Sequence, residues 1–408
     1  MAAKTVDQRA LSPDLRLLAA CVRWPPSPAR TAAIIDALAN PELDWARVAL
    51  AVERHRVAGF VHDGLKAAGA TSAPPEVLAL FGASASADAL LNLRFTGEAL
   101  RLVRRLRDAG IDVLVLKGAG LMTLVYGNLA VRHSRDLDLL VPVGSIIQAG
   151  DVCQRAGYDR IQPPPSASDI ELAEWLRWRK DFVYHHRTAP LTLELHFRAT
   201  DSPRLTRGLD LWCAGREVAI QGSASLPAPD GGALYAYLCL HGAMCAWFRL
   251  KWLADIAALT AGRSEEELAA LHASAVERGV GRASGQALLL VEAVFGDPLP
   301  SSLRKSLLAD RRVLWLARFG LRVMSDPRTP HEVPFRSSQV GLSHLLLSDD
   351  WRVGLDEVRS WLIDWPLVFS LRLPRGLRFL YVMLRGPVWL ARKFSRGPKR
   401  GPGDRGRT

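Results

Sequence analysis

Apolar and polar positions alternate over several short segments in the middle of the chain, and a period of two predicts β-strands. Such segments lie at 111–116, 135–141, 182–186 and 191–198, with a turn at 187–190 between the last two. On both sides of this middle part, apolar residues recur at the spacing of amphipathic helices. The pattern therefore predicts an α/β (α+β) fold in which a small mixed β-sheet is flanked by N- and C-terminal helical regions.

Prolines and glycines interrupt the helical pattern and suggest where its parts begin and end. We expect four regions: N-terminal helices at 1–110, a core at 111–222, C-terminal helices at 223–370, and a basic amphipathic segment with a disordered tail at 371–408. The predicted helices lie at 15–22, 45–65, 75–81, 85–109, 121–126, 143–156, 232–246 and 248–260.

Two aspartates separated by one residue, Asp136 and Asp138, are the most informative feature of the predicted sheet. Residues i and i+2 of a strand point to the same face, so both carboxylates project together while Leu137 lies on the opposite face. A buried pair of carboxylates is unfavourable unless a cation compensates it. Mg²⁺ uses one or two carboxylates and fills its other positions with water and phosphate oxygens. The pair therefore predicts a phosphate-handling metal site, and a solvated acidic pair at a strand end is the alternative.

A glycine turn precedes these aspartates in the sequence. Lys117, Gly118, Ala119 and Gly120 follow the strand at 111–116 and lead into an apolar helix. A strand, a glycine turn and a helix together place free backbone N–H groups at a helix N-terminus, where anions bind. Because glycine lets a ligand approach the backbone closely, this turn is predicted to hold phosphate.

A third carboxylate comes from the segment 190–197, whose alternation places Thr192, Glu194 and His196 on one face. If this strand lies beside the strand of the aspartates, Glu194 joins their site. Three carboxylates on adjacent strands can hold two metal ions, which activate an attacking oxygen and stabilise a leaving pyrophosphate. His196 is expected near the metal site, and a role in hydrogen bonding is the alternative to a role as a ligand.

The order of these motifs resembles the uncharacterised bacterial nucleotidyltransferase family of the polymerase-β-like superfamily. The resemblance covers roughly residues 15–260 and rests on Leu116–Ala119, Tyr126–Gly127, Arg132–Val141, Gly157–Tyr158, Glu194–His196 and the helical stretch 241–256. It implies a nucleotidyltransferase core at 111–222 that transfers a nucleoside monophosphate from a nucleoside triphosphate (NTP) to an acceptor. By this resemblance, Asp136 and Asp138 match the metal-binding pair, Glu194 the third acidic position, and Gly118 the glycine of the phosphate-side turn.

One position departs from the superfamily pattern: Ala119 stands where a serine hydroxyl would contact the triphosphate. We expect Mg²⁺ (or Mn²⁺) at Asp136, Asp138 and Glu194, which are the predicted catalytic residues, and an acceptor that the sequence does not identify. Phosphate is expected at the turn from Lys117 to Gly120. Arg132 is a further phosphate-binding candidate, and pairing with a structural acid is its alternative. A catalytically inactive binding or scaffold protein is the alternative for the whole chain.

Charge is concentrated at the C-terminus. The chain has 53 Lys or Arg against 41 Asp or Glu, a net charge of +12, and residues 371–408 contain eleven Arg or Lys and one Asp. That segment therefore carries +10, and residues 1–370 are close to neutral, so no specific nucleic-acid site is predicted. Its apolar stretch, 377–394, is predicted to form two short helices and fits a peripheral membrane contact. A terminal helix packed on the protein is the alternative.

Other features indicate a cytoplasmic protein, peripheral to the membrane if the C-terminus binds lipid. The five cysteines form no CxxC pair, which fits reduced thiols. No uninterrupted apolar run reaches about 18 residues, so no membrane-spanning helix is predicted. The N-terminus lacks a signal-peptide pattern.

Overall fold

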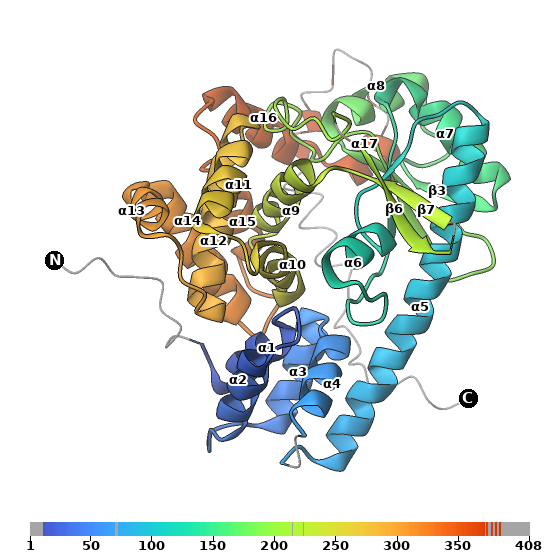
Figure 1. Ribbon diagram of the computed structural model, residues 1–408. Helices are drawn as coiled ribbons and strands as arrows, with labels where there is room; N and C mark the ends of the chain where they lie inside the picture. The colour runs from blue at the N-terminus through green and yellow to red at the C-terminus, as the bar shows by residue number, and fades with distance from the viewer. Residues whose placement is uncertain are drawn as a thin grey trace.

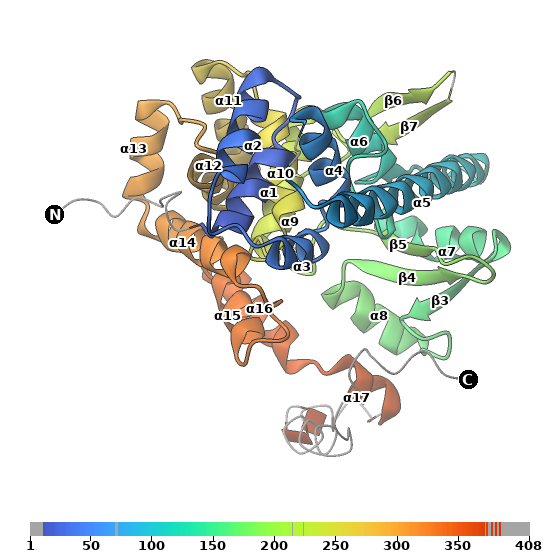
Figure 2. The same cartoon turned by 90° about the horizontal axis from the view of Figure 1, so that it is seen from below.

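The computed structural model confirms the predicted fold class: a small mixed sheet is preceded and followed by helices (Figure 1). Figure 2 shows the sheet on one side of the molecule and most of the helices on the other. The structure describes residues 11–69, 72–213, 215–222 and 224–371, together with positions 373, 377, 380, 381, 383 and 384.

Helices occupy the chain before the sheet, and polar side chains begin several of them. Ser12, Ser27 and Asp44 each accept a backbone hydrogen bond from the first turn of the helix that follows. The helix predicted at 45–65 is divided at Arg56, which adopts a left-handed φ of 56°. The helices are α1 (Pro13–Val22), α2 (Pro28–Leu38), α3 (Trp45–His55), α4 (Ala58–Ala67) and α5 (Pro75–Asp108).

Helix α5 runs without a break for 34 residues, whereas the sequence predicts two helices there. Phe95, Leu102 and Leu106 of its C-terminal half are buried in the apolar core that also contains the sheet. By length and composition alone, α5 could cross a membrane: an 18-residue window has a mean hydropathy of 1.2, and 11% of that window is buried. The prediction of no spanning helix rests on a stricter criterion, an uninterrupted apolar run.

The main sheet has the strand order β1-β2-β5-β4-β3. Strands β2 and β5 are parallel, and the other neighbouring pairs are antiparallel. The predicted pairing of the segments around 182–186 and 191–198 is confirmed, because β4 and β5 form an antiparallel pair. The strands are β1 (Leu114–Val115), β2 (Leu137–Leu140), β3 (Tyr158–Gln162), β4 (Asp181–His186) and β5 (Thr192–His196).

The two faces of the sheet differ in character. Leu137, Leu139, Leu193 and Leu195 face one side and share an apolar core with α5 and with α7 (Ile146–Arg155). Because successive residues of a strand alternate in direction, the residues between these leucines face the other side. That second side carries the polar residues of β2 and β5.

Several elements connect or extend the strands. Strands β6 (Arg216–Gln221) and β7 (Ala224–Ala228) form a separate two-stranded hairpin, and Pro227 lies in its second strand. This hairpin and α8 (Asp169–Trp178) have no counterpart among the elements predicted from the sequence. The other connecting elements are α6 (Ala119–Tyr126) and the 3₁₀ turn η2 (Val143–Ser145).

Helices follow the sheet and share one apolar core with the N-terminal helices. Leu17, Ile34 and Phe60 from the first part of the chain belong to the same buried cluster as Leu253 and Leu290. The helices are α9 (Gly231–Met244), α10 (Leu250–Thr260), α11 (Glu265–Glu277), α12 (Gly281–Phe295), α13 (Ser301–Ala309), α14 (Arg311–Ser325), α15 (Arg336–His344), α16 (Trp351–Leu362) and α17 (Trp365–Ser370).

The predicted region boundaries at 110, 222 and 370 stay predictions. The two short helices predicted within 377–394, and the tail after them, fall almost entirely outside the described residues.

Candidate active site

The glycine turn lies against the strand of the aspartates. Strand β1 ends at Val115, and the N–H of Leu116 donates to the carbonyl oxygen of Asp138 at 3.1 Å. Gly118 then adopts φ 70° and ψ −134°, a conformation that residues with a side chain rarely adopt, and α6 begins at the next residue. The turn therefore brings the N-terminus of α6, with its free backbone N–H groups, close to β2.

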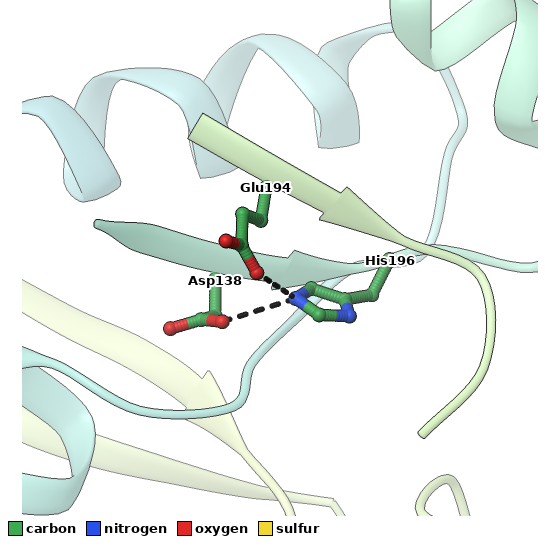
Figure 3. A group of neighbouring side chains, drawn as sticks. All are labelled: Asp138, Glu194 and His196. Carbon is green, nitrogen blue, oxygen red and sulfur yellow. Dashed lines mark hydrogen bonds and ion pairs between the residues drawn. The ribbon is translucent and has the colours of Figure 1, made fainter. Parts of the chain in front are cut away.

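Asp138, Glu194 and His196 form a compact group on the polar side of the sheet (Figure 3). Asp138 and Glu194 are register partners in the parallel pair β2–β5, and His196 lies two residues further along β5. The Nε2 atom of His196 is 3.0 Å from Oδ1 of Asp138 and 3.3 Å from Oε2 of Glu194. One ligand atom from each side chain lies within 4.8 Å of the others.

Two lysines compensate the charge of this group. The Nζ atom of Lys117 is 3.0 Å from Oδ1 of Asp138, and Nζ of Lys180 is 3.4 Å from Oε2 of Glu194. Lys180 also forms an ion pair with Asp181, the first residue of β4. Lys117, predicted to bind phosphate, is therefore paired with the central carboxylate in this structure.

These contacts set the protonation of the carboxylates. Burial is the largest influence on Asp138 and disfavours its charge, but Lys117 and His196 outweigh burial and hold the pKa of Asp138 well below its usual value. Burial also opposes the charge of Glu194, yet its hydrogen bond to His196 and the nearby Lys180 lower the pKa of Glu194 to about 2. Both side chains are therefore ionised at neutral pH, as metal ligands must be.

Asp136 stands beside this group rather than within it. It is the residue before β2, and its side chain is half-buried. Among the described residues, its carboxylate forms no hydrogen bond or ion pair. Burial and then the charge of Asp138 raise the pKa of Asp136, while Lys117 lowers it. The charge of Asp136 is thus not fully compensated, whereas the neighbouring Asp138 and Glu194 already have partners.

The carboxylates keep oxygens that a metal ion could bind. Within the described part of the chain, Oδ2 of Asp138 and Oε1 of Glu194 accept no hydrogen bond, since the contacts to lysine and histidine use the other oxygen of each group. Figure 3 shows both remaining oxygens on the side away from the imidazole ring. Carboxylate oxygens suit Mg²⁺ or Mn²⁺, so the donors present fit such an ion.

A second group of positive charges lies near Asp136. Lys251, the second residue of α10, is buried, and its Nζ donates to the carbonyl oxygen of His133 at 3.2 Å. Burial, then the nearby charges of Arg132 and Arg56, lower the pKa of Lys251 to about 7. Among the described residues, neither Lys251 nor Arg56 forms an ion pair with a carboxylate. This group therefore has positive charge that lacks a partner.

Arg132, the other predicted phosphate ligand, is paired with a buried acid. Its Nε and one terminal nitrogen each lie 2.7 Å from the carboxylate oxygens of Asp255 on α10. The hydroxyl of Tyr126 donates to the same carboxylate at 2.8 Å. The guanidinium thus ties the loop before β2 to α10, and pairing with an acid, the alternative given above, is what the structure shows. A phosphate-binding role for Arg132 stays a prediction.

Sequence reasoning missed Lys180 and Lys251. Lys180 directly precedes the predicted strand at 182–186, and Lys251 lies in an apolar helix start within the stretch that resembles the family. For Lys251, a lysine in a largely apolar segment was the available signal; Lys180 lies among other charged residues, and no local pattern distinguishes it.

Comparison with known proteins finds a family model that covers the region of the site. No curated protein matches the chain. A family model described as "Uncharacterised nucleotidyltransferase" matches residues 41–296, which include every residue of the site described above. The match covers more than half of the 408 residues, and the chain belongs to this uncharacterised nucleotidyltransferase family.

Proposed function

We propose that this protein is a metal-dependent nucleotidyltransferase that moves a nucleoside monophosphate from an NTP to an acceptor. The observation that carries the proposal is the pairing of Asp138 with Glu194 on adjacent parallel strands, directly beside the turn at the start of α6. Carboxylates next to a helix N-terminus suit a ligand that brings both phosphate groups and a divalent cation.

Asp136, Asp138 and Glu194 would hold Mg²⁺ (or Mn²⁺). When bound, such an ion stabilises the negative charge that develops on the phosphoryl oxygens and on the leaving pyrophosphate. The acceptor oxygen or nitrogen attacks the α-phosphorus and forms one new bond, while the bond from that phosphorus to the bridging oxygen breaks and pyrophosphate leaves. The proton that the acceptor loses passes to solvent water. Because its pKa is about 2, Glu194 is a poor acceptor for that proton, which favours a role as a ligand.

The phosphates would lie between the two positively charged groups. One group is the N–H groups at the start of α6 with Lys117, and the other is Lys251 with Arg56; the charges of Lys117, Lys251 and Arg56 all act on Asp136. An anion between them would supply the missing partner for Lys251. It would also draw Lys117 away from Asp138 and free a further carboxylate oxygen.

A second candidate function is nucleotide-independent binding by a catalytically inactive member of the family. The specific observation in its favour is that Lys117 and His196 already compensate Asp138 without any metal ion. The alanine at position 119, which provides no hydroxyl at the start of α6, points the same way.

Transfer of label from the α-phosphate distinguishes these candidates. The protein is incubated with Mg²⁺ and each of the four NTPs, labelled at the α-phosphate or at the γ-phosphate, together with metabolite and protein fractions as acceptors. The proposal predicts label in an acceptor only from the α-labelled NTP, with release of pyrophosphate, and loss of transfer in Glu194→Gln. Transfer only from the γ-label would identify a kinase instead. No transfer from any NTP, with no nucleotide binding, would support the inactive candidate.

A further inference from the structure

Helix α16 exposes a row of large apolar side chains. Trp351, Leu355, Val358 and Leu362 are 71%, 37%, 39% and 38% exposed. Their spacing of four, three and four residues places them along one face of the helix. Val353 on the opposite face is buried. This exposed row, Trp351, Leu355, Val358 and Leu362, is called the α16 face below.

The charges of α16 are sorted by sign. Both acids of the helix point inward: Asp356 forms an ion pair with Arg204 at 2.7 Å, and Glu357 contacts His344 at 3.1 Å. Both are buried. The two arginines of the helix, Arg352 and Arg359, are exposed. The solvent side of α16 therefore offers apolar surface and positive charge, and its negative charges are enclosed.

The acids at the ends of α16 also form hydrogen bonds or ion pairs within the fold. Asp350 begins α16 by accepting a hydrogen bond from the backbone of Arg352, and Asp364 caps α17 in the same way. Asp349 forms ion pairs with Arg282 and Arg312. The acids that flank the α16 face thus stabilise the fold. Among the described residues, Arg352 and Arg359 form no ion pair.

The α16 face is held firmly relative to the sheet. Helix α17 follows after two residues, and its Trp365 and Phe369 lie 4.8 and 5.8 Å, between ring centroids, from Trp175 of α8. The ion pair from Asp356 to Arg204 adds a contact from the middle of α16. Figure 1 shows α16 and α17 at the top of the molecule and α1 to α4 at the bottom.

We propose that the α16 face docks on an anionic lipid membrane surface. Apolar side chains with a tryptophan enter the interfacial region of a bilayer, and arginines beside them attract anionic headgroups. The chain that follows, 371–408, carries +10 and adds attraction of the same sign. A second copy of α16 would offer these arginines no exposed acid, because both acids of the helix are buried. This inference is independent of the catalytic proposal.

Sedimentation with vesicles tests the docking. The full chain is mixed with vesicles of neutral phosphatidylcholine alone or with about one third phosphatidylglycerol, at low and high salt. We expect binding to the anionic vesicles, weakened by salt. The full-chain variant Leu355→Glu/Val358→Glu should bind them about tenfold more weakly, since it replaces apolar contacts with negative charge. The matched control is Ile35→Glu/Leu50→Glu, which changes two exposed apolar residues of α2 and α3 and should bind as the wild type does.

Other outcomes would overturn the proposal. Circular dichroism first confirms that both variants fold, as expected for exposed positions. Absence of binding to anionic vesicles at low salt, or equal binding by wild type and the α16 variant, would exclude docking through this face. A wild type that is dimeric by light scattering, with a monomeric α16 variant, would show that a second copy covers the face instead.

Discussion

Replacing Lys251 with methionine is expected to stabilise the protein while weakening its binding of nucleotide. The lysine is buried, its charge faces Arg132 and Arg56, and its hydrogen bond goes to the backbone of His133. Methionine has a similar length and no charge, so it can fill the same space. A binding role would explain why a residue that lowers the stability of the fold lies beside the proposed phosphate site.

The magnitude follows from the pKa of Lys251, which is about 7 in the folded protein against an ordinary 10.5. Each tenfold change in proton affinity corresponds to about 1.4 kcal/mol, so the lysine lowers the free energy of unfolding by about 4 kcal/mol at pH 7. The carbonyl of His133 loses its hydrogen bond in the variant, and this loss offsets about 1 kcal/mol of the stabilisation gained by removing the lysine. The variant should therefore be more stable by about 3 kcal/mol at pH 7.

The sign of the pH dependence is fixed by the lowered pKa. Between pH 7 and pH 10.5 the unfolded chain carries a proton on Lys251 that the folded protein lacks, so the contribution of this residue to stability becomes less unfavourable as pH rises. The advantage of Lys251→Met should shrink by about 2 kcal/mol from pH 7 to pH 9. Below pH 7 the stability advantage of the variant should be constant or larger than at pH 7.

Denaturant unfolding at several pH values, paired with calorimetric titration of Mg²⁺–NTP, measures both effects. Lys251→Met should weaken nucleotide binding at least about tenfold, because the triphosphate loses one charge partner. Lys66→Met, which removes an exposed lysine of α4, is the matched control and should change neither quantity appreciably. A destabilised Lys251→Met variant, or one that binds nucleotide as the wild type does, would refute the reasoning.

Three further substitutions test other parts of the site. Arg132→Ala should lower the free energy of unfolding by about 3–5 kcal/mol, because it leaves Asp255 buried without its partner; an unchanged melting temperature would contradict this. Ala119→Ser should raise nucleotide affinity about fivefold by adding a hydroxyl at the start of α6, and calorimetry that finds no gain would argue against phosphate at this turn. Gly118→Ala should cost about 1–3 kcal/mol because of its positive φ, whereas Gly97→Ala, in open space on α5, should be neutral or slightly stabilising.

The sequence predicted the two central carboxylates well because strand geometry is local. Asp138 and Glu194 each sit in a short apolar alternation, and the period of two fixes the face on which each lies. Asp136 was assigned to the same strand, but β2 begins one residue later. Its position beside the group, rather than within it, depends on how the preceding loop is held by Arg132 and Asp255, which no local pattern shows.

Other features depended on packing between distant segments. Lys180 reaches the site from the residue before β4 and Lys251 from α10, so their roles appear only when these segments are placed against β2 and β5. The β6–β7 hairpin escaped prediction because Pro227 weakens the strand pattern. In α5, the small residues at 82–87 resemble a break between helices, yet the helix continues through them.

Binding of Mn²⁺ in the presence of a non-hydrolysable NTP tests the proposed metal site most directly, because paramagnetic resonance counts the bound ion without requiring the acceptor. The wild type should bind Mn²⁺ with the nucleotide, and Asp138→Asn should bind the ion at least about tenfold more weakly, since a neutral amide replaces a charged ligand. Asp159→Asn, which alters an exposed acid of β3, should bind as the wild type does. A wild type that binds no Mn²⁺ with nucleotide, or equal binding by Asp138→Asn, would contradict a metal site at Asp138.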